Sequence, residues 1–495
     1  MISTLLACIY ITFVCLMWGA AVMNVFNRLL PVPGEISPVI ITFLGLAVIT
    51  TFSGLLSLFV PLGGLWIQVF LLVPALIYFF IAYSTSRRLI KAFFPGLSNL
   101  FSGWFLSFLF LILLMSSWKI IHPDTLGYHA QVIKWIEEHK AVPGIVNLQT
   151  RLGLQNTWFV ACAVFSFTFT GSLAVTYINS AVVIWMLLFA IQQINRQVKQ
   201  GKELSALGGV LLLGICLWSY TMIRLTVTSA SPDFIAAIIT ALVFFLFLSE
   251  KEPASPILII LLGIFAITIK LSAAPVILVV LYPLIKFTRL KKNRTVLIFL
   301  ATGLIILLPF ITRNIISSGY PLFPSGNFNF IEADWKIPEQ KVADLQHYIT
   351  GYAKGFRGED IHDISNGATA NLSEWVPVWW NHLSLSDRAI LFLLVLLLIA
   401  GVFRFRSIMR AELKKKYALL TTLAGSLFWF IYAPDPRFGY GFTISLMAIL
   451  FYILIEEKGK FNPNFIKIRT VAIYASILLI NAYTVYRFVH FFQPA

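Results

Sequence analysis

The sequence predicts an all-α fold: a polytopic membrane protein with about 14 transmembrane helices and interfacial helices in its external loops. Hydrophobic residues make up 59% of the chain and charged residues 12%, against the 45–50% or so of apolar residues usual in soluble domains. The charged residues gather between apolar runs of about 15 to 24 residues, roughly the length of a helix that crosses hydrocarbon. Continuous runs such as Ala389 to Phe403 differ from the alternating segments of a membrane β-barrel.

The first apolar run lacks a basic leading region and is long enough to span, so we expect a membrane helix there rather than a cleaved signal. The short stretch 157–170 is expected to be a tilted or partial helix, and the alternative is that the weak basic cluster 196–202 lies outside. The spans are predicted near 2–23, 38–60, 64–83, 101–118, 172–194, 206–222, 234–249, 256–270, 273–287, 295–312, 389–403, 417–432, 441–455 and 470–489.

The net charge of +16 does not indicate nucleic-acid binding, because the basic residues flank the predicted spans. In that position they indicate which loops are cytoplasmic. By the positive-inside rule their clusters are cytoplasmic: Arg87, Arg88 and Lys91; Arg196, Lys199 and Lys202; Lys286 to Arg294; Arg404 to Lys416; Lys458 to Arg469. Segments 119–156, 223–233, 313–388 and 433–440 and both termini are then external. The four cysteines sit inside apolar runs and indicate no disulfide framework.

The first external loop contains the run His122-Pro-Asp-Thr-Leu-Gly-Tyr-His129, followed by an amphipathic stretch from Ala130 to His139. Asp124 stands at the start of that stretch. One interpretation is a helix N-cap. The other is a general base, because a carboxylate just outside the bilayer can accept a proton from a hydroxyl. Both can hold at once.

Cationic side chains in the other external segments are candidates for binding a phosphate. Arg313 closes a span and opens the loop 313–388, where it could reach the headgroups or bind a phosphate through paired hydrogen bonds. Arg437 lies in a turn with Asp435, and the pair could brace the turn or contact the same phosphate. Arg224 is a further cationic candidate, and Lys270 is one whose favoured interpretation is snorkelling to the membrane surface. The acidic Asp233, in the run Ser231-Pro232-Asp233, is a further external candidate for a supporting role.

The long loop 313–388 carries Trp335, Trp375, Trp379 and Trp380. Tryptophan suits either an interfacial aromatic belt or stacking against a sugar face. We prefer the belt for Trp379 and Trp380, which approach the next span.

These external segments, in this order, resemble the GT-C superfamily of polyprenyl-phosphate-sugar glycosyltransferases, including its protein-mannosyltransferase-like and aminoarabinose-transferase-like bacterial branches. Asp124 falls where that family has an acidic residue in the first external loop of its catalytic module. The run Arg-Asn…Gly-x-Pro-Leu-Phe-Pro from Arg313 resembles a recurrent family segment, and Pro436-Arg437-Phe438 resembles the family's Pro-Arg-Tyr. One mechanism of this family uses paired carboxylates with a bound metal. In this sequence Asp124 has no adjacent second acid.

The resemblance implies an inverting membrane glycosyltransferase that moves a sugar from a polyprenyl-phosphate donor to an extracytoplasmic glycan, lipid or protein acceptor, at the bacterial cytoplasmic membrane. It divides the chain into leading helices (1–100), a catalytic module (101–330) with first loop 119–156, a long external loop (313–388) and C-terminal helices (389–495). No cofactor is firmly expected, and a divalent metal, such as zinc on His122, Asp124 and His129, is an open alternative. The implied site residues are catalytic Asp124; phosphate-binding Arg313, Arg437, Lys270 and Arg224; and supporting His122, Tyr128, His129, Asp233 and Asp435.

Two other functions stay open at this point. An O-antigen-type polymerase or ligase would use a lipid-diphosphate donor. A transporter of lipid or polysaccharide would place polar or broken helices near the bilayer midplane, where the sequence has few ionisable residues.

Overall fold

The structure is a computed structural model that describes residues 1–30, 36–93, 100–117, 120, 122–171, 176–200, 225–249, 256–358 and 361–456, together with 482, 486 and 489. Throughout these ranges the regular structure is helical and no strand occurs. The predicted all-α fold is therefore confirmed.

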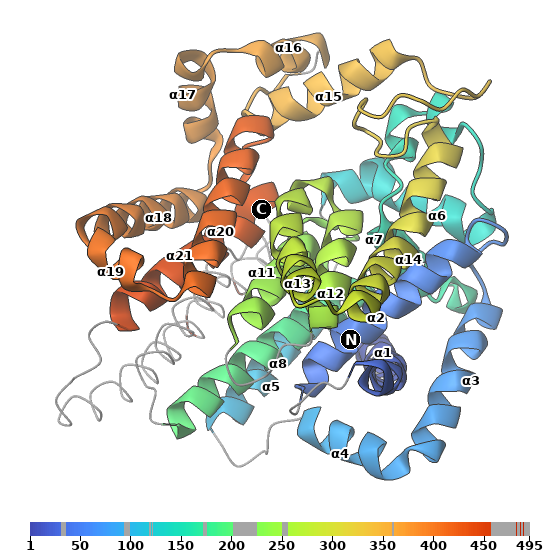
Figure 1. Cartoon of the computed structure of the whole chain (residues 1–495). Helices are drawn as coiled ribbons and strands as arrows, with labels where there is room; N and C mark the ends of the chain where they lie inside the picture. Colours follow the sequence, from blue (N-terminus) through green and yellow to red (C-terminus); the bar gives the residue numbers. More distant parts are fainter. Residues whose placement is uncertain are drawn as a thin grey trace.

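The α-helices, from six to 28 residues long, follow one another along the described chain (Figure 1). They are α1 (Ile2–Leu29), α2 (Pro38–Leu56), α3 (Leu65–Ile81), α4 (Tyr83–Phe93), α5 (Leu100–Ser116), α6 (Ala130–Glu138), α7 (Thr157–Val164), α8 (Tyr177–Lys199), α11 (Asp233–Leu248), α12 (Pro256–Ile269), α13 (Ile277–Arg289), α14 (Asn293–Ser318), α15 (Glu339–Ala353), α16 (Ile361–Asn366), α17 (Leu372–His382), α18 (Leu385–Phe403), α19 (Phe405–Arg410), α20 (Leu413–Tyr432) and α21 (Pro436–Glu456). Short turns join them: the π-helix η1 (Thr125–His129) and the 3-10 helices η2 (Ile145–Asn147), η3 (Thr150–Gly153), η4 (Thr168–Thr170), η5 (Leu271–Val276) and η6 (Gly367–Thr369).

The first two helices cross at a point where both backbones are in direct contact. A Cβ added at Gly19 would lie 1.9 Å from the carbonyl oxygen of Ile41, and one at Gly45 would lie 1.7 Å from that of Cys15. Only glycine fits there, as in the small-residue contacts of membrane helices. The crossing fixes α1 against α2, and α2 in turn packs on α7, α12 and α14.

Helix α12 lies at the centre of the main hydrophobic core, where it contacts α2, α11, α13 and α14. Its sequence is apolar on every side, and residues from Ile257 to Ile269 are almost all buried. A helix without a polar face has to be covered on all sides. The leading helices and the later helices therefore share one core.

Other helices expose apolar stripes on the outside of the molecule. On α14 the exposed side chains recur at helical spacing: Leu297, Leu300, Leu304, Ile305 and Leu308. Helix α18 does the same with Phe392, Val395, Leu396, Ile399 and Val402. Contiguous apolar surface of this kind indicates contact with a membrane.

Seven helices in the described residues are long and apolar enough to cross a membrane, or eight if the pair α3 and α4, bent by 107°, forms one broken span. The sequence predicted about 14, of which the spans near 206–222 and 470–489 lie outside the described residues. Several other predicted spans form helices too short for the length test, such as α11 with 16 residues and α12 with 14. Helix α7 has eight residues, or about 12 Å of rise, so the stretch 157–170 is only a partial helix.

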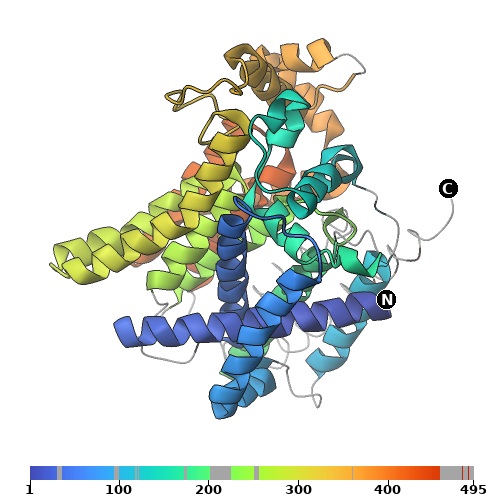
Figure 2. The same cartoon turned by 90° about the vertical axis from the view of Figure 1, so that its right-hand side faces the viewer.

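The molecule has two distinct ends along the vertical axis of Figures 1 and 2. Helices α15, α16 and α17 of the long loop lie at one end (top in both views). Helix α4 and the lower part of α3 lie at the other end.

Introducing a charge on the exposed stripe of α14 is expected to hinder membrane insertion. Leu304 is 62% exposed near the middle of the helix, and Leu304→Arg should cost about 3–4 kcal/mol of insertion free energy. A glycosylation-mapping assay on the α14 segment measures that cost, with Leu304→Ile as the apolar control. Equal insertion of both variants would mean that α14 does not face lipid.

Candidate functional site

Charged side chains from distant parts of the sequence meet at one place. Contributions come from the first predicted external loop, the start of α11, the end of α12 and the turn before α21. We name this group the aspartate–arginine cluster, and its members are His122, Asp124, Asp233, Lys270, Asp435 and Arg437. All six were among the candidates predicted from the sequence.

Asp124 immediately precedes the π-helix η1. Its side chain makes no capping hydrogen bond, so the N-cap interpretation gains no support from the contacts. The predicted amphipathic helix is α6, which buries Val132, Ile133 and Ile136. This packing of α6 anchors the loop, while the Asp124 side chain stays 37% exposed. Short π-helical turns such as η1 are frequent at functional sites.

Asp233 and Lys270 form an ion pair across α11 and α12. Asp233 is the first residue of α11, where a carboxylate is favoured by the helix dipole. Lys270 is the residue directly after α12, and its ammonium group contacts the Asp233 carboxylate. The same ammonium lies 3.4 Å from the centre of the Phe438 ring. Lys270 therefore points into the protein, and the preferred snorkelling interpretation is not what the structure has.

The turn before α21 holds Arg437 by one edge of its guanidinium group. Nε lies 3.2 Å from Oδ1 of Asp435 and Nη2 lies 3.0 Å from Oδ2, so the two side chains pair in a fork. The Arg437 backbone N–H also donates to Oδ1 of Asp435, over 3.1 Å. Asp435 thus fixes the orientation of the Arg437 guanidinium. It braces the turn and also belongs to the aspartate–arginine cluster.

Two tryptophans brace this turn from behind. The indole N–H of Trp379 donates to the Pro434 carbonyl over 2.7 Å, and that of Trp429 donates to the Asp435 carbonyl over 2.7 Å. Trp379 is buried with Trp375. The belt interpretation of Trp379 is therefore wrong, because its indole serves a backbone acceptor inside the protein. Through α17 the long loop 313–388 supports the turn that carries Arg437.

The remaining nitrogen of Arg437, Nη1, faces the other members of the cluster. It lies 3.7 Å from Oδ2 of Asp124, 3.6 Å from Oδ2 of Asp233 and 3.3 Å from Nε2 of His122. All three separations exceed the 2.7–3.2 Å or so of a good N–H···O hydrogen bond. Nη1 is therefore aimed at the centre of the cluster without a tight partner there.

The carboxylates of the cluster differ in how far water and substrates can reach them. The Asp124 side chain is 37% exposed, whereas those of Asp233 and Asp435 are 9% and 12% exposed. Asp233 is paired with Lys270 and Asp435 with Arg437. Asp124 is thus the accessible acid, and the other two hold the cations in place.

Two histidines of the first loop, His122 and His129, are buried. Burial lowers the pKa of His122, although Asp233 and Asp124 oppose that shift. Burial also lowers the pKa of His129, whose Nδ1 lies 3.1 Å from the Thr125 hydroxyl. His122 faces two hydrogen-bond donors, the backbone N–H of Asp124 at 3.2 Å and the Arg437 side chain. A neutral imidazole has one acceptor nitrogen, so it can accept a hydrogen bond from one of these two donors at a time.

The same contacts bear on the alternative of a metal ion. In the described ranges no group of three or more His, Cys, Asp or Glu side chains is arranged to hold one. Both ring nitrogens of His122 face donors from the protein, and Nδ1 of His129 is occupied by Thr125. The residues proposed for zinc therefore do not fit a metal in this arrangement.

Arg313, a predicted phosphate ligand, lies apart from the cluster. Its Nε donates to Oε1 of Gln155 over 2.8 Å and its Nη1 to the Ser57 hydroxyl over 2.7 Å. The side chain is 4% exposed and borders a cavity of about 10 Å³, which holds no more than about one water molecule. Arg313 thus connects α14 to the ends of α2 and η3. Arg224 lies outside the described residues.

Two features of the outer rim were missed by the sequence analysis. The Arg151 guanidinium lies 5.9 Å from the ring centre of Tyr128 and 5.1 Å from that of Tyr348 on α15. It thereby connects the first loop to the long loop beside the cluster, and burial raises the pKa of the Tyr128 phenol. Asp387 contacts the Tyr440 hydroxyl. The available signal for Arg151 was that it is the one arginine in the sequence of segment 119–156.

A double-mutant cycle tests the Lys270–Asp233 pair. Lys270→Met should lower the free energy of unfolding by about 3–5 kcal/mol, because it leaves a buried carboxylate without its partner. Adding Asp233→Asn should recover much of that loss, since both charges are then removed. Thermal unfolding in detergent measures the cycle, and independent effects of the two substitutions would contradict a direct pair.

Comparison with known proteins gives a family for almost the whole chain. No curated protein and no solved structure matches it. A family model described as a domain of unknown function, DUF8201, matches residues 1–444, which includes the leading helices, the long loop and every member of the aspartate–arginine cluster. The chain belongs to the DUF8201 family.

Proposed function

We propose that the protein is a membrane glycosyltransferase that moves a sugar from a polyprenyl-phosphate donor to an acceptor on the extracytoplasmic face, with inversion. The observation that carries the proposal is an accessible carboxylate, Asp124, beside an oriented guanidinium, Arg437. The two groups come from loops that the charge pattern predicts to be external. A base for the acceptor and a cation for the leaving phosphate are the two groups that this reaction needs.

Asp124 is suited to act as the general base. It is the most exposed carboxylate of the cluster, and no capping bond occupies its oxygens. Arg437 Nη1 lies 3.7 Å from Oδ2 of Asp124, which is too far for a tight hydrogen bond. An acceptor hydroxyl could therefore reach the oxygens of Asp124 from the open side of the cluster.

Arg437 and Lys270 are suited to stabilise the leaving phosphate. Asp435 holds the guanidinium by one edge and leaves Nη1 directed into the cluster. Lys270 brings a second positive charge, held by Asp233 and lying over the Phe438 ring. Fixed cations placed where negative charge develops contribute strongly to catalysis, because they need no reorganisation during the reaction.

The chemistry balances with these groups alone. The acceptor oxygen attacks the anomeric carbon of the sugar and passes its proton to Asp124. The bond from that carbon to the phosphate oxygen breaks, and the electron pair leaves with the polyprenyl phosphate, whose new charge Arg437 and Lys270 neutralise. Attack from the face opposite the phosphate inverts the anomeric carbon.

The arrangement of the predicted external segments supports an active site on one membrane face. Segments 119–156, 223–233 and 433–440 all contribute members of the cluster, and segment 313–388 braces it through Trp379. Chain segments on one side of a membrane can meet in this way. We propose the cytoplasmic membrane of a bacterium as the location, with about 14 spans and the cluster facing outward.

Replacing the proposed base should abolish transfer while leaving the fold intact. Asp124→Asn is expected to lower kcat by about 10²–10⁴-fold, the usual contribution of a positioned base. Its effect on thermal unfolding should be small because the side chain is partly exposed. The assay follows sugar transfer from purified polyprenyl-phosphate sugars by the full-length protein in detergent or nanodiscs.

The matched control is Glu138→Gln, which removes a carboxylate from the same loop. Glu138 is 52% exposed and pairs with Lys134 on the surface of α6, outside the aspartate–arginine cluster, so this variant should transfer sugar at the normal rate. Unchanged transfer by folded Asp124→Asn protein would refute the proposal. Transfer from diphosphate donors alone would favour a polymerase or ligase, and lipid translocation without transfer would favour a transporter.

A further inference from the structure

The buried Arg313 borders a small cavity where α14 meets the first external loop. The volume of this cavity is about 10 Å³, which gives room for an occupant of about the size of a water molecule. We name it the Arg313 cavity. Its other lining residues are Trp135, Lys140, Ala141, Val142, Ile145, Gln155 and Ser317.

The Arg313 guanidinium is buried among partners that carry no charge. Arg313 is 4% exposed, and its hydrogen bonds go to the Gln155 amide oxygen and the Ser57 hydroxyl. No carboxylate in the described residues forms an ion pair with it, and none of the lining residues is acidic. Arginine keeps its positive charge in proteins, and a buried charge is normally paired. The guanidinium therefore lacks the negative partner that its burial calls for.

The two neutral partners are themselves held in place, so the guanidinium is fixed with donors to spare. The side-chain amide of Gln155 donates to the Leu152 carbonyl over 2.7 Å. The Ser57 hydroxyl donates to the Gly54 carbonyl over 2.7 Å. A guanidinium has five N–H donors, and these two bonds of Arg313 leave three without a partner in the described residues. The cavity wall thus contains oriented, unused donors of a charged group.

Lys140 brings a second positive charge to the wall of the Arg313 cavity. It follows the end of α6 and is exposed, so the wall that it forms lies next to the protein surface. The carboxylates of α6 are engaged by other groups: Glu138 pairs with Lys134, and Glu137 hydrogen-bonds with Ser166. Two positive charges without a negative one among the lining residues favour an anion.

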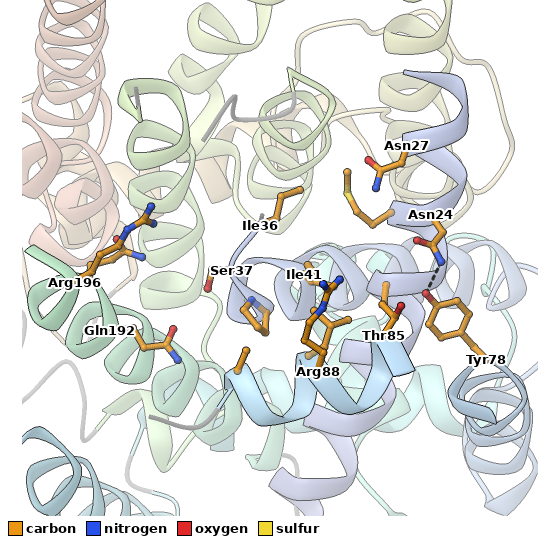
Figure 3. A pocket seen from close by; sticks show the side chains of 16 residues that line it. Asn24, Asn27, Ile36, Ser37, Ile41, Tyr78, Thr85, Arg88, Gln192 and Arg196 are labelled. Atoms are coloured by element: carbon orange, nitrogen blue, oxygen red, sulfur yellow. Dashed lines mark hydrogen bonds between the residues drawn. The ribbon is translucent and has the colours of Figure 1, made fainter. Parts of the chain in front are cut away.

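A larger cavity elsewhere in the molecule does not combine these features. Its volume is about 430 Å³, and it lies between α1, α2, α4 and α8 (Figure 3). Arg88 and Arg196 line it from α4 and α8. Arg196 already takes part in an interaction and Arg88 is exposed, so neither has the buried, uncompensated charge of Arg313.

We propose that the Arg313 cavity binds a small inorganic anion, chloride, which supplies the missing negative charge at the junction of α14, the end of α2 and the first external loop. A chloride ion is only slightly larger than a water molecule, whereas a phosphate group exceeds the space. The ion accepts charge-assisted hydrogen bonds from the unused N–H groups of Arg313 and lies in the field of Lys140. This site is separate from the aspartate–arginine cluster, and it stabilises the loop that carries Asp124 whatever reaction takes place there.

The test measures thermal unfolding of the purified full-length protein in detergent while sodium chloride replaces sodium gluconate at constant ionic strength. Gluconate is too large for the cavity. A ligand that binds only the folded protein raises Tm as its concentration rises, and saturating chloride should raise Tm by roughly 2 °C or more. Arg313→Gln, which removes the buried charge, should lose this dependence on chloride. Lys140→Gln should need about threefold more chloride for the same rise, because one of the two cations is gone.

The matched control is Lys134→Gln, which removes the same charge from α6 at a residue outside the cavity wall. It should respond to chloride like the unmodified protein. If Arg313→Gln does not fold, the comparison of Lys140→Gln with Lys134→Gln still decides, because both positions are exposed.

Bromide, located by anomalous diffraction from crystals of the full-length protein, gives an independent reading and should lie beside the Arg313 guanidinium. Equal unfolding curves in chloride and gluconate, an unchanged chloride dependence in Arg313→Gln, or a cavity that holds only water in bromide would each overturn the proposal. Neither measurement involves sugar transfer, so its failure is distinguishable from failure of the proposed function.

Discussion

The position of Arg437 is the constraint on which the candidate site depends. A guanidinium that is largely withdrawn from water is stabilised by neighbouring carboxylates, and this one has Asp435 along one edge and Asp124 and Asp233 beyond Nη1. The requirement draws together the first loop, α11 and the turn before α21. The tryptophans behind the turn keep it from moving away, so that the long loop also contributes to the position of one charge.

The fold class and much of the side-chain burial followed from the sequence because both depend on local pattern. Apolar runs became helices, and the amphipathic stretch after Asp124, which was expected to be an interfacial helix, is α6, whose apolar residues are buried inside the protein. Span lengths were less predictable. A run of apolar residues has the same appearance whether lipid or protein covers it, so α12, enclosed by neighbouring helices, was predicted in the same way as the exposed α14.

The cluster residues were found from the sequence because charges are rare here and the topology grouped them on one side. Their individual roles needed tertiary structure. Arg313 had the same sequence context as Arg437, at a helix end beside a proline-rich loop, yet it is directed inward to Gln155 and Ser57. The sequence placed Trp379 at the membrane surface, but its indole N–H donates a hydrogen bond to the Pro434 carbonyl.

The most direct test of the account is an experimental structure of the full-length protein with an uncleavable polyprenyl-phosphate-sugar analogue. The account predicts the phosphate beside Lys270 and Nη1 of Arg437, with the anomeric carbon close to Asp124. A phosphate bound elsewhere, with the aspartate–arginine cluster closed on itself as an internal ion-pair network, would contradict it.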